Sequence, residues 1–395
     1  MNVLVINTGS SSLKYQLFDM DNQRVLIAGV VERIGETPGI ITHRNFCSSS
    51  ADKTREAQPI PNHQEAMHRV AGLITQKIDA IGHRVVQGGE SFKAATLITR
   101  DVKKAIQENN PLAPLHNPPN LIGIHLAEDL FPGKPQVAVF DTNFHQTIPE
   151  KAFLYALPHE YYTKYKIRKY GFHGTSHKYT AQKAAQLMGK KPEETNLITL
   201  HLGNGCSISA VKKGKCQDTS MGMTPLAGVM MGTRTGDFDP AIFGYLMEKT
   251  GMTQKELDEV LNKKSGFKGI CGLNDLRDIH EQSALGDKPA QLALDMFTYQ
   301  IKKYIGAYVA VLGHVDALVF TAGIGENDEI VRAKALEEMS FLGIEIDPDK
   351  NKTRSREARM IHSTKSRVQI WVVPANEELQ IAMETCELLK NYSPQ

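Results

Sequence analysis

A strand–turn–strand pattern that occurs once in each half of the chain constrains the fold more than any other feature. An apolar run leads into the Gly- and Ser-rich turn 7–12, and a second apolar run, 197–202, leads likewise into the turn 203–207. The first glycines of the two turns, Gly9 and Gly203, stand 194 positions apart (203 minus 9), close to half of the 395 residues. The repeat predicts two similar α/β domains that each present a glycine-bearing turn.

These turns carry the kinds of groups that bind phosphate. Backbone N–H groups and Ser hydroxyls supply directed donors, and Lys14 at the far edge of the first turn supplies positive charge. A third Gly-rich turn, 321–327, follows the apolar strand 317–320. A plain hairpin remains the alternative for any one turn, but the three together predict a nucleotide held by its phosphates. The pattern G-x-x-x-x-G-K-[ST] does not occur in the sequence, which excludes a P-loop kinase.

Helical and strand patterns alternate along the chain, as expected of doubly wound α/β sheets. Asn117 before two prolines and Ser176 are the expected N-caps of two of the helices. The segment 37–62, with three prolines and a run of serines, predicts an irregular surface excursion. The expected helices cover 64–77, 121–129, 176–188 and 290–312, and the expected strands cover 137–140, 197–202, 317–320 and 369–373.

Composition excludes several function classes. Lys and Arg outnumber Asp and Glu by 46 to 44, so the net charge of +2 gives no strong field for nucleic acid or an anionic membrane. No apolar run reaches the roughly 18 residues of a membrane span, and the N-terminus lacks a signal-peptide pattern, so we expect a cytoplasmic protein. The five cysteines are scattered without a C-x-x-C pair, which predicts reduced thiols rather than disulfides or a zinc site.

Six short blocks, in order along the chain, resemble the acetate kinase family, within the broader group of two-domain phosphotransferases that includes actin, hexokinase and the Hsp70 ATPase domain. The blocks are 7–14 (NTGSSSLK), 82–90 (GHRVVQGGE), 139–145 (VFDTNFH), 170–177 (YGFHGTSH), 230–237 (MMGTRTGD) and 374–379 (PANEEL). The resemblance implies an α/β fold of two similar domains of the ribonuclease H-like type with a cleft between them. It also implies a homodimer.

The half-chain repeat and the resemblance together give expected domain boundaries. The first domain covers 1–142 and carries the first phosphate turn, and the C-terminal helix, from about 379 to 395, returns to it. The second domain covers 143–378 and carries the nucleotide site and the dimer surface.

The reaction implied by the resemblance is reversible transfer of the γ-phosphoryl group of ATP to acetate, giving acetyl phosphate and ADP, with Mg²⁺ or Mn²⁺. Because Arg84 and Lys14 can hold both reactants at once, we expect direct in-line transfer without a phosphorylated enzyme. Two other functions remain open. One is an ATPase resembling actin or Hsp70, whose nucleotide drives a shape change for a protein partner, and the other is a regulatory nucleotide-binding module without turnover.

Two arginines are the main candidates for binding anions. Arg234 stands in a segment too rich in Gly and small polar residues for a helix interior, so we expect a loop and assign this guanidinium to charge on the transferring phosphoryl group. The alternative is an arginine that pairs with Asp237 or Asp239 and braces the loop. Arg84 follows a predicted strand, and its fork suits a carboxylate; the resemblance assigns it to the substrate carboxylate, and a surface arginine is the alternative.

Asp141 and His173 complete the expected catalytic set. Asp141 directly follows a buried strand, where α/β proteins bind ligands. A small carboxylic acid has a pKa of roughly 4–5 and needs no base at neutral pH, so we expect Asp141 to orient arginines or metal-bound water, although the family assigns it a catalytic part. His173 and His177 have metal-ligand spacing, but the glycines around His173 predict a loop. The resemblance assigns His173 to the phosphoryl group and leaves His177 structural, with a core histidine as the alternative for His173.

The metal and the nucleotide are assigned mainly by resemblance. Asn7 and Glu377 are the candidate Mg²⁺ ligands, directly or through water, and helix capping is the alternative for Glu377. The ATP phosphates are expected near Lys14, His201, Leu202, Gly203, Asn204 and Gly205, and the adenosine near Asp275, Leu276, Arg277, Gly323, Ile324, Gly325, Glu326 and Asn327.

The acid pocket is apolar in this chain. By resemblance it is formed by Val86, Leu115, Phe172 and Pro225. Val86 leaves little room beyond a methyl group, and one methylene is worth about 1–3 kcal/mol, so propionate is expected to be a weaker substrate rather than a rejected one. Two residues depart from the family pattern: Gln87 stands where a His is usual, and Phe238 replaces an aliphatic residue.

Overall fold

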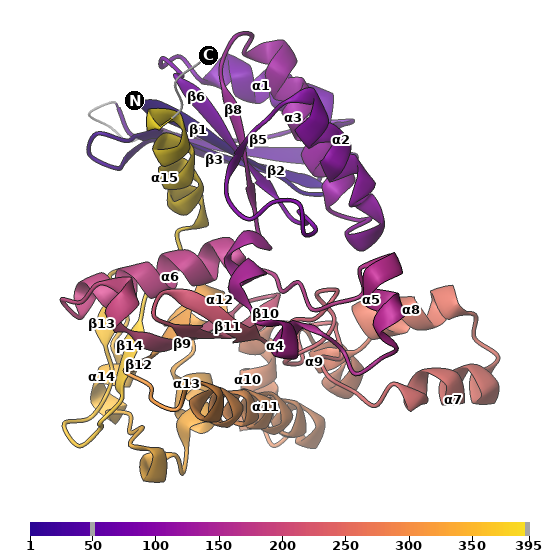
Figure 1. The fold of residues 1–395 in the computed structure, drawn as a ribbon, viewed down its shortest axis with the longest axis vertical. Coiled ribbons are helices and arrows are strands. Elements are labelled where there is room, and N and C mark those ends of the chain that lie inside the picture. Colours follow the sequence, from indigo (N-terminus) through magenta and orange to yellow (C-terminus); the bar gives the residue numbers. More distant parts are fainter. Residues whose placement is uncertain (48–51, 392–395) are drawn as a thin grey trace. The chain divides into compact units, whose positions relative to one another are not determined.

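The computed structural model describes residues 1–47 and 52–391, which divide into two compact units (Figure 1). Unit 1 comprises Met1–Gln146 and the C-terminal segment from Asn376, and unit 2 comprises Thr147–Ala375. The expected boundaries at 142 and 379 stand four and three residues away from these divisions. Glu377, which the expected boundaries put in the second domain, therefore belongs to unit 1 by its contacts.

Unit 1 is built on an eight-stranded sheet in the order β5-β4-β3-β2-β1-β6-β8-β7. Strands β1 to β5 form an antiparallel meander, β1, β6 and β8 run parallel, and β7 is antiparallel to β8. The strands are β1 (Asn2–Thr8), β2 (Ser12–Asp19), β3 (Arg24–Glu32), β4 (Gly39–Asn45), β5 (Asp52–Gln58), β6 (Ala80–Val85), β7 (Thr96–Leu97) and β8 (Gln136–Phe140).

Helices cover both faces of this sheet. They are α1 (His63–Leu73), α2 (Arg100–Glu108), α3 (Asn117–Leu130) and α15 (Glu377–Lys390). A Cβ on Gly82 of β6 would meet Thr385 and Ile381 of α15, whereas Thr8 of β1 lies against Gly123 of α3. Since side chains alternate along a strand, odd-numbered residues of β1 and even-numbered residues of β6 face α15, and the others face α3.

Unit 2 contains a six-stranded sheet in the order β11-β10-β9-β12-β14-β13. Strands β9, β10 and β11 are antiparallel, β9, β12 and β14 run parallel, and β13 is antiparallel to β14. The strands are β9 (Asn196–Leu202), β10 (Cys206–Lys212), β11 (Lys215–Thr219), β12 (Ala317–Thr321), β13 (Arg359–Met360) and β14 (Gln369–Val372).

In unit 2, α6 packs on β9 and β12, and the long α11 packs on β9, β10 and β11. Figure 1 shows these two helices on opposite faces of the sheet. The helices are α4 (Glu150–Phe153), α5 (His159–Tyr165), α6 (Gly174–Leu187), α7 (Ala241–Thr250), α8 (Gln254–Lys263), α9 (Gly266–Cys271), α10 (Leu276–Ala284), α11 (Lys288–Leu312), α12 (Ala322–Asn327), α13 (Glu329–Leu336) and α14 (Pro348–Lys352). Short 3₁₀ turns lie at Asn110–Leu112, Asn143–Thr147, Pro192–Glu194 and Ser340–Leu342.

The two sheets share one topology, as the half-chain repeat predicts. The order β3-β2-β1-β6-β8-β7 in unit 1 matches β11-β10-β9-β12-β14-β13 in unit 2, with the same parallel and antiparallel neighbours. Unit 1 differs by two further strands, β4 and β5, at one edge. The fold is therefore a duplicated α/β unit.

Three expectations about local structure are wrong. The segment 37–62 is not an irregular excursion, because β4 and β5 extend the sheet there. Asn117 is the first residue of α3 rather than its cap, and its side chain bonds the backbone N–H and C=O of Gln87. Ser176 is an internal residue of α6, and its hydroxyl pairs with His201. In both helices the side chain that was expected to cap the helix forms a hydrogen bond with a residue outside the helix instead.

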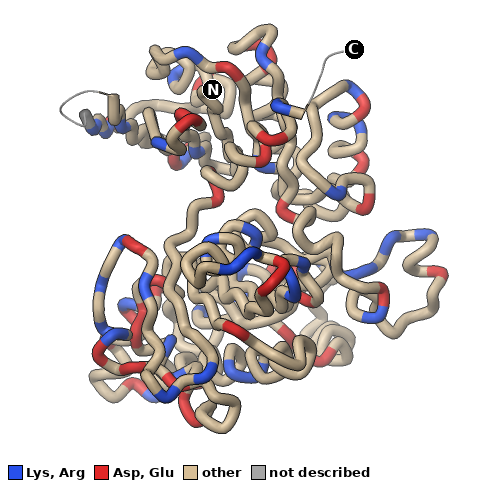
Figure 2. Tube along the Cα trace, turned by 60° about the vertical axis from the view of Figure 1, so that its left-hand side comes forward, with Lys and Arg blue, Asp and Glu red and all other residues tan. Residues whose placement is uncertain are grey.

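The surface carries both signs of charge. Figure 2 shows Lys and Arg interspersed with Asp and Glu along both units. Among the residues that the structure describes, no helix has the length and apolar character needed to cross a bilayer.

Candidate active site

In unit 1, three expected site residues stand at the carboxyl ends of neighbouring parallel strands. Asn7 is near the end of β1, Arg84 is near the end of β6, and Asp141 directly follows β8. The parallel register continues past the last strand residue, because the N–H of Asp141 donates to the carbonyl of Val85 at 2.9 Å. All three side chains face α15, so the sheet itself brings them together.

Arg84 is clamped by its neighbours. Its Nε donates to Asp141 Oδ1 at 3.2 Å, its Nη2 donates to Asp141 Oδ2, and its Nη1 donates to Asn7 Oδ1 at 3.3 Å. The Asp141 side chain is 1% exposed and that of Arg84 is 21% exposed. Burial by itself lowers the pKa of Arg84, but the charges of Asp141 and Glu377 outweigh burial, and the pKa rises. Three hydrogen bonds thus hold the guanidinium in one orientation, on a side chain that is not fully buried.

Glu377 is the first residue of α15 and adds an unsatisfied carboxylate to this cluster. Its Oε1 is buried and accepts no hydrogen bond from the described part of the chain. Burial, together with the charges of Asp141 and Glu378, raises the pKa of Glu377 to about 7 against the opposing charges of Arg84 and Lys14. The capping role considered for Glu377 belongs to Asn376, whose side chain accepts from the N–H of Leu379. Such an orphaned buried oxygen suits a cation.

The first phosphate turn lies beside this cluster. Lys14 of β2 is the antiparallel partner of Asn7 in β1, so both side chains point to the same face of the sheet. Between them, the N–H of Gly9 donates to the carbonyl of Ser12 at 2.8 Å and closes the turn. The exposed ammonium of Lys14 adds positive charge at the ends of these strands.

Val86 and Gln87 are fixed by two asparagines at the start of α3. The N–H of Val86 donates to Asn120, which also donates to the carbonyl of Thr8, so one side chain ties β1 to β6. Gln87 is fully buried, and its Oε1 accepts from the N–H of Gly89. This departure from the family pattern is therefore built into the turn after β6. Val86 and Leu115, both expected to form the acid pocket, differ in exposure: Val86 is 4% exposed and Leu115 is 66% exposed.

In unit 2, a histidine cluster surrounds the second glycine turn. His173 precedes α6 in the left-handed conformation, with φ of 57°, and its ring stacks on that of His201 at 4.1 Å between centroids. Nδ1 of His173 lies 2.9 Å from Ser207 Oγ. His177 is fully buried between Thr199 and Ser207, with contacts of 2.7 Å on both ring nitrogens. His177 therefore holds the sheet to α6, whereas His173 is half-buried in a loop.

Arg234 meets His173 at the same glycine turn. A Cβ on Gly205 would lie 3.1 Å from the His173 ring and 3.9 Å from Nη1 of Arg234. Nη1 donates to the carbonyl of Pro225 at 3.1 Å, and no ion pair of the described residues involves Arg234, so neither Asp237 nor Asp239 braces it directly. Burial lowers the pKa of Arg234. A half-buried guanidinium without a carboxylate is suited to an anionic ligand.

A cavity of about 810 Å³ opens between α10, α12 and the second glycine turn. This volume lies in the range of small-molecule sites, roughly 300–1,000 Å³. Eight expected nucleotide residues line it: Gly203, Asn204, Asp275, Leu276, Arg277, Gly323, Ile324 and Asn327. His201, Leu202, Gly205, Gly325 and Glu326 do not line it, and the Leu202 side chain is wholly in the core. The cavity is also lined by Gly232, Phe267, Asn274, His280, Asp328, Glu329, Ile330 and Arg354, which the sequence analysis missed.

The third glycine turn is a six-residue helix, α12, whose carbonyls are bonded by two arginines, the buried Arg332 and the half-buried Arg359. Arg332 is 1% exposed and donates to the carbonyl of Gly325 at 2.9 Å and to Asn351. Arg359 donates to the carbonyl of Glu326 at 2.9 Å. Burial and the charge of Arg359 lower the pKa of Arg332 to about 10. The two arginines thus fix α12, which forms part of the cavity wall, through the carbonyls of Gly325 and Glu326. No local motif marks either arginine.

Metal ligation by protein groups alone is not supported. Within residues 1–47 and 52–391, no group of three or more His, Cys, Asp and Glu side chains is arranged to hold a metal ion. A cation at Glu377 and Asn7 would therefore need further ligands from phosphate or water, which is how Mg²⁺ is usually held.

The duplicated α/β sheets, the cavity beside the second glycine turn and the superposition on solved kinase structures define a kinase built from two similar α/β units. The chain belongs to the acetokinase family, whose model matches residues 2–383. It is 57% identical over 401 residues to an acetate kinase of Oleidesulfovibrio alaskensis, with 99% of this chain and 100% of the relative covered.

Solved structures agree with this assignment. An acetate kinase of Porphyromonas gingivalis superposes with a TM-score of 0.92 at 43% identity, covering 98% of this chain and 99% of that one. A propionate kinase of Francisella tularensis gives the same TM-score, 0.92, at 41% identity and the same coverage, 98% and 99%.

Proposed function

We propose that this protein transfers the γ-phosphoryl group of ATP to acetate, reversibly forming acetyl phosphate and ADP. The observation that carries the proposal is the Arg84 guanidinium, which Asp141 orients at the ends of parallel strands in a member of the acetokinase family. The acetate kinase relatives support acetate as the acceptor.

The acceptor needs orientation rather than a base. Acetate is ionised at neutral pH, since such acids have pKa values of roughly 4–5. Asp141 is already engaged by two N–H groups of Arg84, which supports a role in aiming the guanidinium at the substrate carboxylate. Buried Val86 next to Arg84 favours a small acyl group, and Leu115, Phe172 and Pro225 are the other proposed pocket residues.

The nucleotide groups in unit 2 support the donor half of the reaction. The 810 Å³ cavity is large enough for a nucleoside, and Gly203 and Asn204 at its edge supply phosphate donors. Arg234, which lacks a carboxylate partner, and His173 are the groups we assign to charge on the transferring phosphoryl oxygens. Lys14 and His201 are assigned to the phosphates.

The residues present also fit Mg²⁺, with Mn²⁺ as an alternative. The orphaned Oε1 of Glu377 and the side-chain oxygen of Asn7 are the hard oxygen donors that these ions prefer. When bound, the ion would neutralise phosphate charge. The fit rests on the buried Oε1 of Glu377, which accepts no hydrogen bond from the described residues.

A hydroxamate assay tests the proposed function. ATP, Mg²⁺, acetate and hydroxylamine are incubated with the protein, because hydroxylamine traps an acyl phosphate as a hydroxamate, which is then measured as its coloured complex with ferric iron. We expect hydroxamate with acetate, less with propionate, and least with butyrate. An actin- or Hsp70-like ATPase would hydrolyse ATP without forming hydroxamate, and a regulatory module would do neither. Either result would refute the proposal.

Direct in-line transfer is part of the proposal. With ATP made chiral at its γ-phosphorus, a single displacement inverts the configuration, and we expect inversion. Retention would require two displacements and a phosphorylated enzyme.

We also propose a cytoplasmic homodimer. Large apolar side chains are exposed on α7 and α11, including Tyr245 and Tyr299 at 61% and 62% exposure, as expected of a surface that a second copy covers. Sedimentation equilibrium distinguishes a dimer from the 43.8 kDa monomer.

A further inference from the structure

The loop that carries Arg234 is closed at its base by two residues. The N–H of Asp237 donates to the carbonyl of Gly228, and the N–H of Gly228 donates to Asp237 Oδ1, both at 2.8 Å. Gly236 completes the closure with φ of 70°, and a Cβ there would lie 2.4 Å from the Gly228 carbonyl oxygen. Residues 228–237 therefore form one closed loop with Arg234 near its tip.

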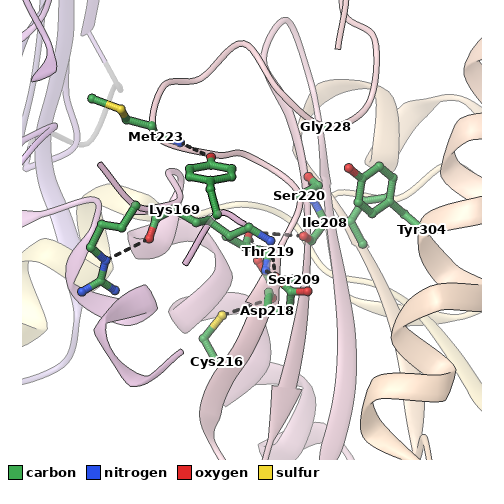
Figure 3. Close-up of polar contacts among 12 residues, drawn as sticks. Lys169, Ile208, Ser209, Cys216, Asp218, Thr219, Ser220, Met223, Gly228 and Tyr304 are labelled. Atoms are coloured by element: carbon green, nitrogen blue, oxygen red, sulfur yellow. Dashed lines mark hydrogen bonds and ion pairs between the residues drawn. The ribbon is translucent and has the colours of Figure 1, made fainter. Parts of the chain in front are cut away.

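The start of this loop is tied to the sheet. The N–H of Ser220 donates to the carbonyl of Ile208 at 2.9 Å, and the N–H of Ile208 donates to the Ser220 hydroxyl at 2.9 Å (Figure 3). Gly228, with φ of 102°, lies so close to Ser220 that a Cβ would be 2.9 Å from its carbonyl oxygen. The base of the loop is thus fixed against β10.

Helix α11 braces the other side of the loop. The Tyr304 hydroxyl donates to Asp237 Oδ2, and the N–H of Met230 donates to Gln300 Oε1 at 2.6 Å. Gln300 and Tyr304 are four residues apart and share one face of the helix. Figure 3 shows Tyr304 beside the segment that carries Gly228. Tyr304 and Gly228 line one cavity of about 180 Å³. Burial and the Asp237 charge raise the pKa of Tyr304, so its hydroxyl remains a donor.

The braced residues are adjacent to the groups that hold Arg234. Met231, which follows the braced Met230, donates its N–H to the Arg234 carbonyl at 3.1 Å, and its sulfur lies 3.4 Å from Arg234 Nη1. A shift of Met230 or Asp237 would therefore be passed to the guanidinium. Small displacements of a charge-stabilising group reduce transfer rates strongly.

We propose that Tyr304 and Gln300 are positioning residues that set the Arg234 guanidinium for phosphoryl transfer. This inference rests on the proposed function, in which Arg234 acts on the transferring group. Neither side chain is in the 810 Å³ cavity, so both act through the loop and not on the nucleotide.

Tyr304→Phe with Tyr308→Phe as its matched control tests the role of the hydroxyl. Tyr308 is one turn further along α11, and its buried hydroxyl has no hydrogen-bond partner in the described part of the chain. We expect Tyr304→Phe to lower kcat about 10- to 100-fold with both KM values within about twofold, as for a misplaced catalytic group. Tyr308→Phe should leave all three constants within about twofold. Equal effects of the two variants would overturn the proposal.

Gln300 gives a second test at one position. Gln300→Glu keeps an oxygen to accept from Met230 and should retain most of kcat, whereas Gln300→Leu removes the acceptor and should lower kcat as Tyr304→Phe does. Both variants should melt within a few degrees of each other. Loss of kcat in proportion to lost melting temperature would show a merely structural role.

A double-mutant cycle and crystal structures separate this inference from the proposed function. In an Arg234→Ala background, Tyr304→Phe should change the residual rate less than twofold; the full loss there would contradict action through Arg234. Crystal structures should show the 3.1 Å distance from Arg234 Nη1 to the Pro225 carbonyl lengthened in Tyr304→Phe and kept in Tyr308→Phe. If the wild type forms no hydroxamate, the proposed function fails. The crystal structures still show whether Tyr304 sets the position of the Arg234 guanidinium.

Discussion

At the residue scale, the orientation of Arg84 depends on two parallel bonds to Asp141. Arg84→Lys keeps the charge but offers one ammonium point, which cannot bond both Asp141 oxygens and the acceptor. We expect the KM for acetate to rise about 10- to 100-fold, from the loss of roughly 1.5–3 kcal/mol of charged hydrogen bonding, with the KM for ATP changed less. Initial rates at varied acetate and saturating ATP measure this. Arg69→Lys, in a partly buried pair within α1, is the control, and equal effects of the two variants would contradict the assignment.

Glu377 makes stability depend on pH. Its folded pKa of about 7 is above the ordinary value of 4.5, so the folded protein binds the proton more tightly than the unfolded chain. The contribution of this proton to stability is complete below pH 4.5 and is lost as pH rises through 7, with a slope of at most about 1.4 kcal/mol per pH unit.

Urea unfolding in metal-free buffer, compared with Glu377→Gln, measures this dependence. The free energy of unfolding of the wild type relative to the variant should fall between pH 5 and pH 7 and stay constant above that range. A difference that grows with pH would mean that Glu377 is stabilised as an anion in the folded state.

Individual residues were predictable where a motif or a strand end marked them. Asn7, Arg84 and Asp141 follow apolar runs, so a shared sheet edge could be expected. We also expected Asp141 to orient an arginine, and it does. That the arginine is Arg84 could not be predicted, because 57 positions separate the two residues and their contact depends on strand order. Tyr304 was missed for the same reason, because it bonds Asp237 across 67 positions. Arg332 bonds the carbonyl of Gly325 only seven positions away, but no motif marks it.

At the element scale, each unit places a candidate site residue at the start of the helix that covers its polar strand ends. Glu377 begins α15 over Asn7 and Arg84, and His173 precedes α6 over His201. The helix must therefore pack at a defined distance from the sheet for its terminal residue to reach the site.

Gly82→Ala tests this spacing in unit 1. A Cβ on Gly82 would be 2.6 Å from Thr385 Oγ1 and 2.8 Å from Ile381, so α15 must move away. We expect a loss of about 1–3 kcal/mol in the free energy of unfolding, as for other overpacked cores, and a higher Mg²⁺ requirement because Glu377 moves with α15. Gly72→Ala is the control, since a Cβ there meets nothing within 4 Å and should be neutral or stabilising. Unchanged stability of Gly82→Ala would contradict close packing.

The prediction of elements succeeded where periodicity was strong. The helices at 176–188 and 290–312 and the strands at 197–202 and 317–320 are confirmed within two residues at each end. Strand β4 and the edge strand β5 were missed because charged side chains and flanking prolines, which suit the margin of a sheet, also resemble a loop. Strand β4 gains its order from pairing with β3, and β5 gains its order from pairing with β4, and no local pattern contains either pairing.

At the scale of the whole molecule, the spacing of 194 residues predicted a duplicated sheet, and the two strand orders confirm it. The exact unit boundaries were not predictable, because they depend on which contacts the connecting residues make. Unit 1 is completed only by the C-terminal helix, whose Leu379, Ile381, Ala382 and Cys386 are buried, so its core joins the two ends of the chain.

Each unit has its own core, and we expect core mutations to loosen one unit at a time. Ile381 of α15 and Ile301 of α11 are both fully buried, and each substitution by Ala should cost about 2–5 kcal/mol. Hydrogen exchange followed by mass spectrometry should show lost protection in β1, β6 and β8 for Ile381→Ala, and in β9, β10 and β11 for Ile301→Ala. ADP, whose proposed cavity lies in unit 2, should restore protection in Ile301→Ala more than in Ile381→Ala, because a ligand stabilises the part of the chain that binds it. Equal loss throughout the chain in both variants would show instead that the units open as one cooperative body.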